Sequence, residues 1–114
     1  MKIASGGAPA VADLIAMFRD KKFPEGWETW WRLGPLALAH GVMTPTLVLH
    51  SENDFRCPIE QAEQYFMALL RNGTTTEFLR FPGEGHEMSR SGKPRHRLER
   101  FEAILDWHDR HLAV

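Results

Sequence analysis

Residues 44–58 read TPTLVLHSENDFRCP, and this stretch decides the fold class. The segment from Thr46 to His50 is apolar up to its histidine and contains residues that favour β-strands. A run without polar alternation predicts a strand covered on both faces, as in a parallel sheet. In an open parallel sheet, functional side chains lie in the loops beyond the carboxyl ends of the strands, which makes Asp54 a candidate site residue.

The segments around this strand alternate between helix and strand. Residues 59–72 carry apolar side chains at helical spacing and end before Gly73, which is typical of a helix stop. Residues 76–81 (TEFLRF) predict a second strand, and residues 96–112 predict a long helix with one apolar side. The other expected elements are a strand at 3–5, a helix at 9–20, a short helix at 27–33, a helical turn within 34–41 and a loop at 82–95. This order predicts a three-layer α/β fold with a mainly parallel sheet of about three strands between helices.

Composition narrows the class of protein. The 114 residues correspond to about one small domain, and 43% hydrophobic residues are enough for a core. The formal net charge of −1 provides no basic field, so we expect no nucleic-acid partner. No apolar run approaches the ~20 residues that span a bilayer, and MKIASGGAP at the start lacks the apolar core of a secretory signal. Cys57 is the only cysteine, which fits a reducing compartment, so we expect a cytoplasmic protein with no membrane partner.

A second polar loop follows the second strand. It reads PGEGHEMS over residues 82–89 and contains His86, 32 residues after Asp54. If the two strands are neighbours, Asp54 can accept the Nδ1 proton of His86 and leave Nε2 free to take a proton from a nucleophile. Gly83 and Gly85 would let the backbone bend and present the histidine. The alternative is a surface aspartate and a loop histidine that do not touch, and spacing alone leaves both open.

Over a long run the sequence resembles a known family. The segments TPTLVLHSENDFRCPIEQAEQYFMALLRNG and TEFLRFPGEGHEMSRSGKPRHRLERFEAILDWHDRHL resemble the C-terminal part of the prolyl oligopeptidase family, and most of all its acylaminoacyl-peptidase branch. The resemblance is strongest from residue 33 to residue 112. It rests on a strand followed by His-Gly-x-x-Asp-x-x-(Val or Cys)-Pro, and on Pro-Gly-Glu-x-His before the last helix. It implies that residues 1–114 are the C-terminal portion of an α/β-hydrolase domain.

The resemblance also implies roles for individual residues. Asp54 matches the acid of a catalytic triad and His86 matches its base, in a serine peptidase or hydrolase that transfers acyl groups of peptides or esters. No cofactor and no metal is implied. Ser51 stands where the family usually has Gly, and Glu87 stands where a small or flexible residue is common. Both departures could shift the loops, but neither removes a member of the triad.

The nucleophile of the family is missing from these residues. It is a serine within Gly-x-Ser-x-Gly, and no serine here has glycine at both of those positions. KIASGGAP resembles the strand after the nucleophile's helix, so we expect this domain to lack the half that carries the nucleophile elbow. Cys57 is a possible substitute, but no feature of the sequence indicates an activated thiol, and structural packing is the favoured interpretation. His108 and His111 have metal-ligand spacing on a helix, but without a third ligand they indicate a solvated helix end.

These expectations lead to two functional hypotheses. The first is a C-terminal segment of a serine peptidase that supplies Asp54 and His86 and acts on a peptide or ester only when the missing half is present. The second is a catalytically inert, hydrolase-derived dimerisation or interaction module. In both, a free sheet edge predicts a homo-oligomer or a partner chain.

Overall fold

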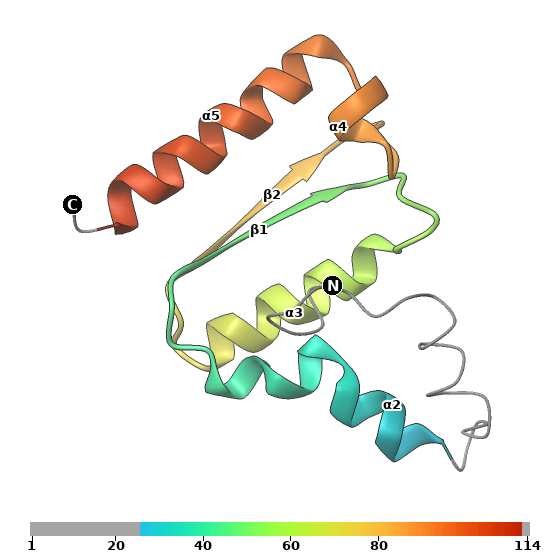
Figure 1. The fold of residues 1–114 in the computed structure, drawn as a ribbon, viewed down its shortest axis with the longest axis vertical. Coiled ribbons are helices and arrows are strands. Elements are labelled where there is room, and N and C mark those ends of the chain that lie inside the picture. Colours follow the sequence, from blue (N-terminus) through green and yellow to red (C-terminus); the bar gives the residue numbers. More distant parts are fainter. Residues whose placement is uncertain (1–25, 113–114) are drawn as a thin grey trace, which may run out of the picture. The chain divides into compact units, whose positions relative to one another are not determined.

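A computed structural model describes residues 26–112. The elements are α2 (Trp27–Leu33), the 3-10 helix η1 (Pro35–Gly41), β1 (Thr46–Ser51), α3 (Ile59–Arg71), β2 (Thr76–Phe81), α4 (Met88–Ser91) and α5 (Pro94–His111) (Figure 1). The strand expected at 3–5 and the helix expected at 9–20 lie outside the described residues. The short helix at 27–33, the helical turn within 34–41 and both strands from the second half of the sequence are confirmed.

The described residues fall into two units, the first ending at Ala39 and the second beginning at His40. In the described part of the first unit, the rings of Trp27 and Trp31 stack with their centroids 5.9 Å apart. Helix α2 ends at Leu33, and the N–H of Gly34 donates to the carbonyl of Trp31. Pro35 follows, and the residue before a proline is disfavoured in helical conformation, which explains the stop.

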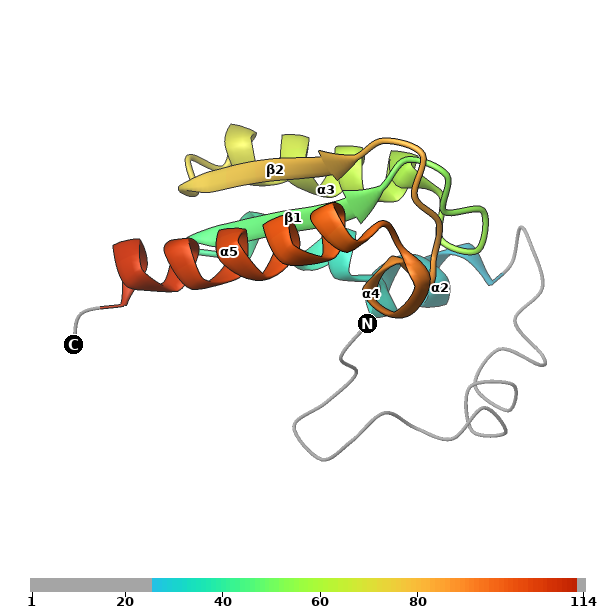
Figure 2. The ribbon, with the colours of Figure 1, turned by 90° about the horizontal axis from the view of Figure 1, so that it is seen from above.

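The second unit contains the sheet. Strands β1 and β2 pair in parallel, in a register that runs from Thr46 opposite Thr76 to Ser51 opposite Phe81. Helix α3 connects them and covers one face, and α5 lies along the other face (Figures 1 and 2). A parallel pair between two helical layers confirms the α/β class predicted from the sequence.

The core lies between the sheet and the helices on its two faces. Its buried apolar side chains include Ala62 and Leu69 of α3, Phe81 of β2 and Trp107 of α5. Gly73 ends α3 with a φ of +77°, a left-handed conformation that glycine adopts at little cost, and the chain turns there into β2. The short segment between α3 and β2 therefore fixes the parallel return of the chain.

The loop expected at residues 82–95 is only partly a loop. It contains the single-turn helix α4, and α5 begins at Pro94, two residues before the predicted start. One turn contains too few residues to show an apolar period, which explains why the sequence pattern missed α4. Proline suits the first turn of a helix because its φ is already helical and its missing N–H has no partner there.

Candidate active site

The loops after β1 and β2 lie side by side at the carboxyl edge of the sheet. Parallel strands in this register end together, with Ser51 opposite Phe81. Two backbone hydrogen bonds continue the pairing into the loops: the N–H of Glu52 donates to Phe81 O over 3.1 Å, and the N–H of Asn53 donates to Glu84 O over 2.9 Å. The ladder thereby brings side chains 32 positions apart in the sequence to one place.

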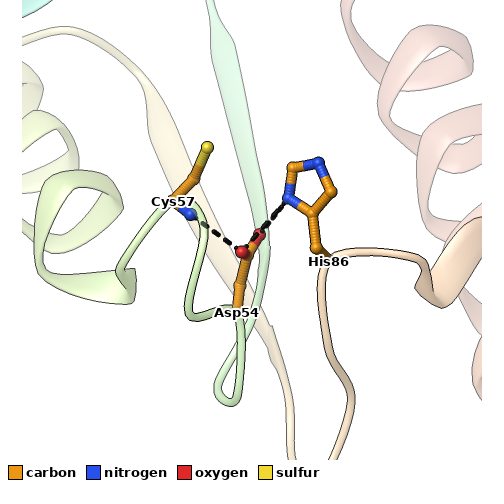
Figure 3. A group of neighbouring side chains, drawn as sticks. All are labelled: Asp54, Cys57 and His86. Atoms are coloured by element: carbon orange, nitrogen blue, oxygen red, sulfur yellow. Dashed lines mark hydrogen bonds and ion pairs between the residues drawn. The ribbon is translucent and has the colours of Figure 1, made fainter.

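Asp54 and His86 are in direct contact at this edge (Figure 3). Nδ1 of His86 lies 3.0 Å from Oδ2 and 3.1 Å from Oδ1 of Asp54. A carboxylate only accepts hydrogen bonds, so this geometry places the ring proton on Nδ1 and leaves the Nε2 lone pair free. Asp54 is buried, whereas the His86 side chain is 40% exposed and points its other nitrogen away from the carboxylate.

The carboxylate of Asp54 is held by its own loop. Its Oδ1 accepts hydrogen bonds from the N–H of Cys57 at 2.9 Å and from the N–H of Arg56 at 3.1 Å. Burial opposes ionisation and would raise the pKa of Asp54, but the bonds from Cys57, His86 and Arg56 together lower that pKa below its ordinary value. The group is therefore a charged acceptor that is already in position.

His50 fixes the same loop from the end of β1. Its Nε2 lies 2.7 Å from the carbonyl oxygen of Cys57, to which it donates, and 3.7 Å from Oδ2 of Asp54. The loop from 51 to 57 is thus closed by two contacts, the Asp54 carboxylate on backbone N–H groups and the His50 ring on a backbone carbonyl. Both act on the turn that presents Asp54.

Glu84 anchors the second loop, a role that the sequence analysis missed. It is buried, and its Oε1 accepts from Nδ1 of His96 at 2.6 Å and from the N–H of Lys93 at 3.0 Å. The hydrogen bond from His96, followed by that from Lys93, lowers the pKa of Glu84, although burial opposes the shift. Gly83 before it has a φ of +71°. The available signal was an acid between two glycines, two residues before His86.

Ser51 and Glu87, which depart from the family pattern, both make contacts in the two loops. Ser51 is buried at the end of β1, and its carbonyl accepts from the N–H of Asp54 at 3.3 Å. Glu87 accepts from Arg56 at 3.1 Å and pairs with Arg90 at 3.2 Å. Because Arg56 belongs to the first loop and Glu87 to the second, this ion pair links the loops next to His86.

Cys57 is exposed, so its interpretation as a packing residue is wrong. Its thiol belongs to a group with Asp54 and His86 in which one donor atom from each residue lies within 4.8 Å of the others. At the far end of α5, His108 is exposed and the His111 ring packs on Trp107 with centroids 4.2 Å apart. His108 therefore lies at a solvated helix end, as expected, whereas the Nε2 of His111 is buried without a hydrogen-bond partner among the described residues, so the expectation of a solvated side chain is wrong for His111.

A pocket of about 330 Å³ adjoins His86. Its lining residues include Asn53, Phe55, Arg56, His86, Glu87 and Met88. Both loops contribute to it, and its volume is in the range of small-ligand sites.

No helix among residues 26–112 is both long enough and apolar enough to cross a bilayer.

Comparisons with known proteins identify relatives of this chain. A model of the prolyl oligopeptidase family matches residues 11–114. The chain is 50% identical over 106 residues to the uncharacterized peptidase YuxL of Bacillus subtilis (strain 168), which covers 90% of this chain and 16% of that protein. It is 32% identical over 83 residues to the acylamino-acid-releasing enzyme of Arabidopsis thaliana, which covers 73% of this chain and 10% of that protein.

Solved structures of related proteins share the fold of this chain. The uncomplexed acylaminoacyl peptidase of Pyrococcus horikoshii superposes with a TM-score of 0.73 at 30% identity, over 86% of this chain and 17% of that one. The chain therefore matches only 10–17% of the length of these relatives, and its fold is part of an α/β-hydrolase domain. With a family match over residues 11–114 and a shared fold, the chain belongs to the prolyl oligopeptidase family.

Proposed function

We propose that this chain supplies the acid and the base of a serine-peptidase triad, Asp54 and His86, in an enzyme of the acylaminoacyl-peptidase type. The observation that carries the proposal is the contact of His86 Nδ1 with both oxygens of a buried carboxylate, at 3.0 and 3.1 Å. The pocket of about 330 Å³ beside the ring offers room for a substrate.

The reaction is acyl transfer. A serine hydroxyl attacks the carbonyl carbon of a peptide or ester, and Nε2 of His86 takes the hydroxyl proton as the bond forms. Asp54 keeps the other ring proton on Nδ1 and stabilises the imidazolium that results. The proton then passes from Nε2 to the leaving amine or alcohol, and water repeats the sequence to release the acid.

The relatives support a peptide as the substrate class. One solved acylaminoacyl peptidase, 33% identical over 75% of this chain, was obtained in complex with Z-Gly-Gly-Phe-chloromethyl ketone, which is a peptide reagent. This supports a peptide substrate for the present site. Cofactors have no part in the mechanism proposed.

The attacking hydroxyl comes from outside these 114 residues, which contain no Gly-x-Ser-x-Gly. It belongs either to a longer polypeptide that includes this segment or to a separate chain. Within the described residues, β1 and β2 form a two-stranded sheet, and a strand of the missing half would pair with one of its outer edges. The chain alone is then inactive toward peptides and esters.

A chimera tests the roles of Asp54 and His86. In it, the matching segment of the Bacillus subtilis peptidase is replaced by this chain, because the two are 50% identical. We expect the chimera to hydrolyse aminoacyl-nitroanilides or p-nitrophenyl esters, and the isolated chain to show no hydrolysis. Asp54→Ala and His86→Ala should each lower kcat by about 10⁴-fold, as for other triads.

The matched control is Arg80→Gln. Arg80 of β2 pairs with Glu52, which follows β1, and with Glu63 of α3, and it does not line the pocket beside His86, so its loss should leave kcat unchanged. Activity that survives both alanine substitutions in the chimera would contradict the assignment of the triad.

An inert dimerisation or interaction module is the second candidate. It is favoured by an apolar stripe formed by Leu98, Phe101 and Leu105 of α5 and by Leu112 directly after it, each of which is more than half exposed. A chimera without activity, together with a stable self-associated chain, would support this function instead.

A further inference from the structure

The side chains of Asp54, Cys57 and His86 form a mixed donor cluster (Figure 3). One carboxylate oxygen, one thiol sulfur and one ring nitrogen lie within 4.8 Å of one another. Among residues 26–112, no other group of three or more His, Cys, Asp or Glu side chains has metal-site geometry. The triad chemistry proposed above uses Asp54 and His86 but gives the thiol nothing to do.

The three donors suit a thiophilic divalent cation. Thiolate, imidazole and carboxylate are the protein ligands of zinc, and a set of three leaves the fourth tetrahedral position for water. Bonds of about 2.0–2.3 Å would bring the ligand atoms to within about 3.3–3.8 Å of one another. Cys57 and His86 are exposed and can rotate to close the remaining distance, while Asp54 is already fixed by its backbone bonds.

We propose that Asp54, Cys57 and His86 bind a zinc-like cation through Oδ, Sγ and Nδ1, as an inhibitory site. Binding requires a lone pair on Nδ1, so the proton now on Nδ1 moves to Nε2. The thiol of Cys57 becomes a thiolate and releases its proton to solvent. In total one proton leaves for each cation bound, and no redox step occurs.

The bound state and the catalytic state exclude each other. With the cation on Nδ1, Asp54 no longer accepts the ring proton, and the protonated Nε2 cannot take a proton from a hydroxyl. The cation would thus hold the base in the wrong tautomer. Binding itself depends only on this chain, and only the inhibitory consequence rests on the proposed function.

The test of binding uses the full chain, freed of metal with EDTA. Titration with Co²⁺ should give a thiolate-to-cobalt charge-transfer band in the near ultraviolet, with one ion bound for each chain. Titration calorimetry with Zn²⁺ in buffers of different ionisation enthalpy should show release of about one proton for each ion at neutral pH.

The variants identify the ligands. Cys57→Val replaces the thiol with the other side chain that the family pattern allows, and should abolish the charge-transfer band and weaken Zn²⁺ binding by more than about tenfold. Cys57→Ser, closer in size, should do the same, and Asp54→Asn and His86→Gln should also weaken binding. The matched control is His108→Gln, on the exposed end of α5, which should bind like the unsubstituted chain.

Two results would overturn the site. One is the absence of a thiolate band in the Co²⁺ complex of the unsubstituted chain. The other is Zn²⁺ binding that is unchanged in Cys57→Val or is lost in His108→Gln. In the active chimera, inhibition by Zn²⁺ that Cys57→Val relieves would confirm that the site is inhibitory. Equal inhibition of the chimera with Cys57 and of the chimera with Cys57→Val would contradict the inhibitory role of the site but not the binding of the cation.

Discussion

The acid of the candidate site shows how a buried charge is kept ionised at the scale of single residues. A buried carboxylate is costly unless hydrogen bonds satisfy it, and Asp54 receives them from Cys57, Arg56 and His86. His50 holds the same turn through the carbonyl of Cys57. The position of the carboxylate therefore depends on short contacts made within one loop and on one contact from the other loop.

Glu84 is a second buried carboxylate, and its partners His96 and Lys93 lie at the start of α5. These partners lower the pKa of Glu84 below its ordinary value of 4.5. A lowered pKa means that the ionised group stabilises the folded state. That stability is complete above the unfolded value, and it is lost as the pH falls through the folded pKa.

We therefore expect Glu84→Gln to lower the urea midpoint at neutral pH and to leave it nearly unchanged in strong acid. The measurement is urea unfolding of both proteins with EDTA present, at several values between pH 7 and pH 2.5. The difference between the two curves isolates the contribution of Glu84. A difference in urea midpoint that stays constant from pH 7 to pH 2.5 would mean that the charge of Glu84 does not contribute to stability.

At the scale of elements, the site depends on two strands that end at the same level. The register of β1 with β2 places Ser51 opposite Phe81, and the backbone bonds of Glu52 and Asn53 extend it into both loops. Helix α5 then begins within reach of the second loop because Glu84 accepts from the N–H of Lys93. For this to occur, the backbone between α4 and α5 must pass close to Glu84.

Gly92 in that segment has no room for a side chain. An added Cβ would lie 2.5 Å from the carbonyl oxygen of Met88 and 2.9 Å from Oε2 of Glu84. We expect Gly92→Ala to lower the free energy of unfolding by about 1–3 kcal/mol, as overpacking does elsewhere. Chemical denaturation measures the change.

The control for Gly92 is Gly41→Ala. An added Cβ at Gly41 has no neighbour within 4 Å, so this variant should stay within about 1 kcal/mol of the unsubstituted protein or be slightly more stable. Equal loss of stability in the two variants would show that the crowding around Glu84 and Met88 is not the cause.

At the scale of the whole molecule, apolar surface remains open on α5. Leu98, Phe101 and Leu105 occupy one side of the helix at spacings of three and four residues, and each is more than half exposed. Contiguous apolar surface of this kind marks an interaction face. We propose that a second copy of the chain covers it.

We expect the purified chain to self-associate to a greater extent as its concentration rises. Leu105→Glu should prevent this association because it places a charge in the apolar face. Light scattering after size-exclusion chromatography gives the mass at each concentration. Met43→Glu is the control because Met43 is 85% exposed and lies outside α5. A constant monomer mass of the unsubstituted chain would contradict the proposal, as would equal effects of the two substitutions.

Some of the fold was accessible from sequence because long elements repeat a pattern. The strands at Thr46–Ser51 and Thr76–Phe81 and the helix Ile59–Arg71 agree with the predicted elements to within one residue. The helix Met88–Ser91 was not predicted, since four residues show no period. The contact of Asp54 with His86 could be inferred as one of two alternatives, whereas the Glu84–His96 contact joins segments whose approach no local pattern encodes.

The sequence by itself determined the α/β class, the strand-to-loop positions of Asp54 and His86, and the family. These follow from local periodicity and from motifs that consist of residues close together in the sequence. Only the tertiary structure decided that the carboxylate and the imidazole are in contact, that Cys57 is exposed beside them, and that Glu84 ties the histidine loop to α5. The physical reason is that these contacts depend on strand register and on the path of the chain between α4 and α5, which combine residues far apart in the sequence.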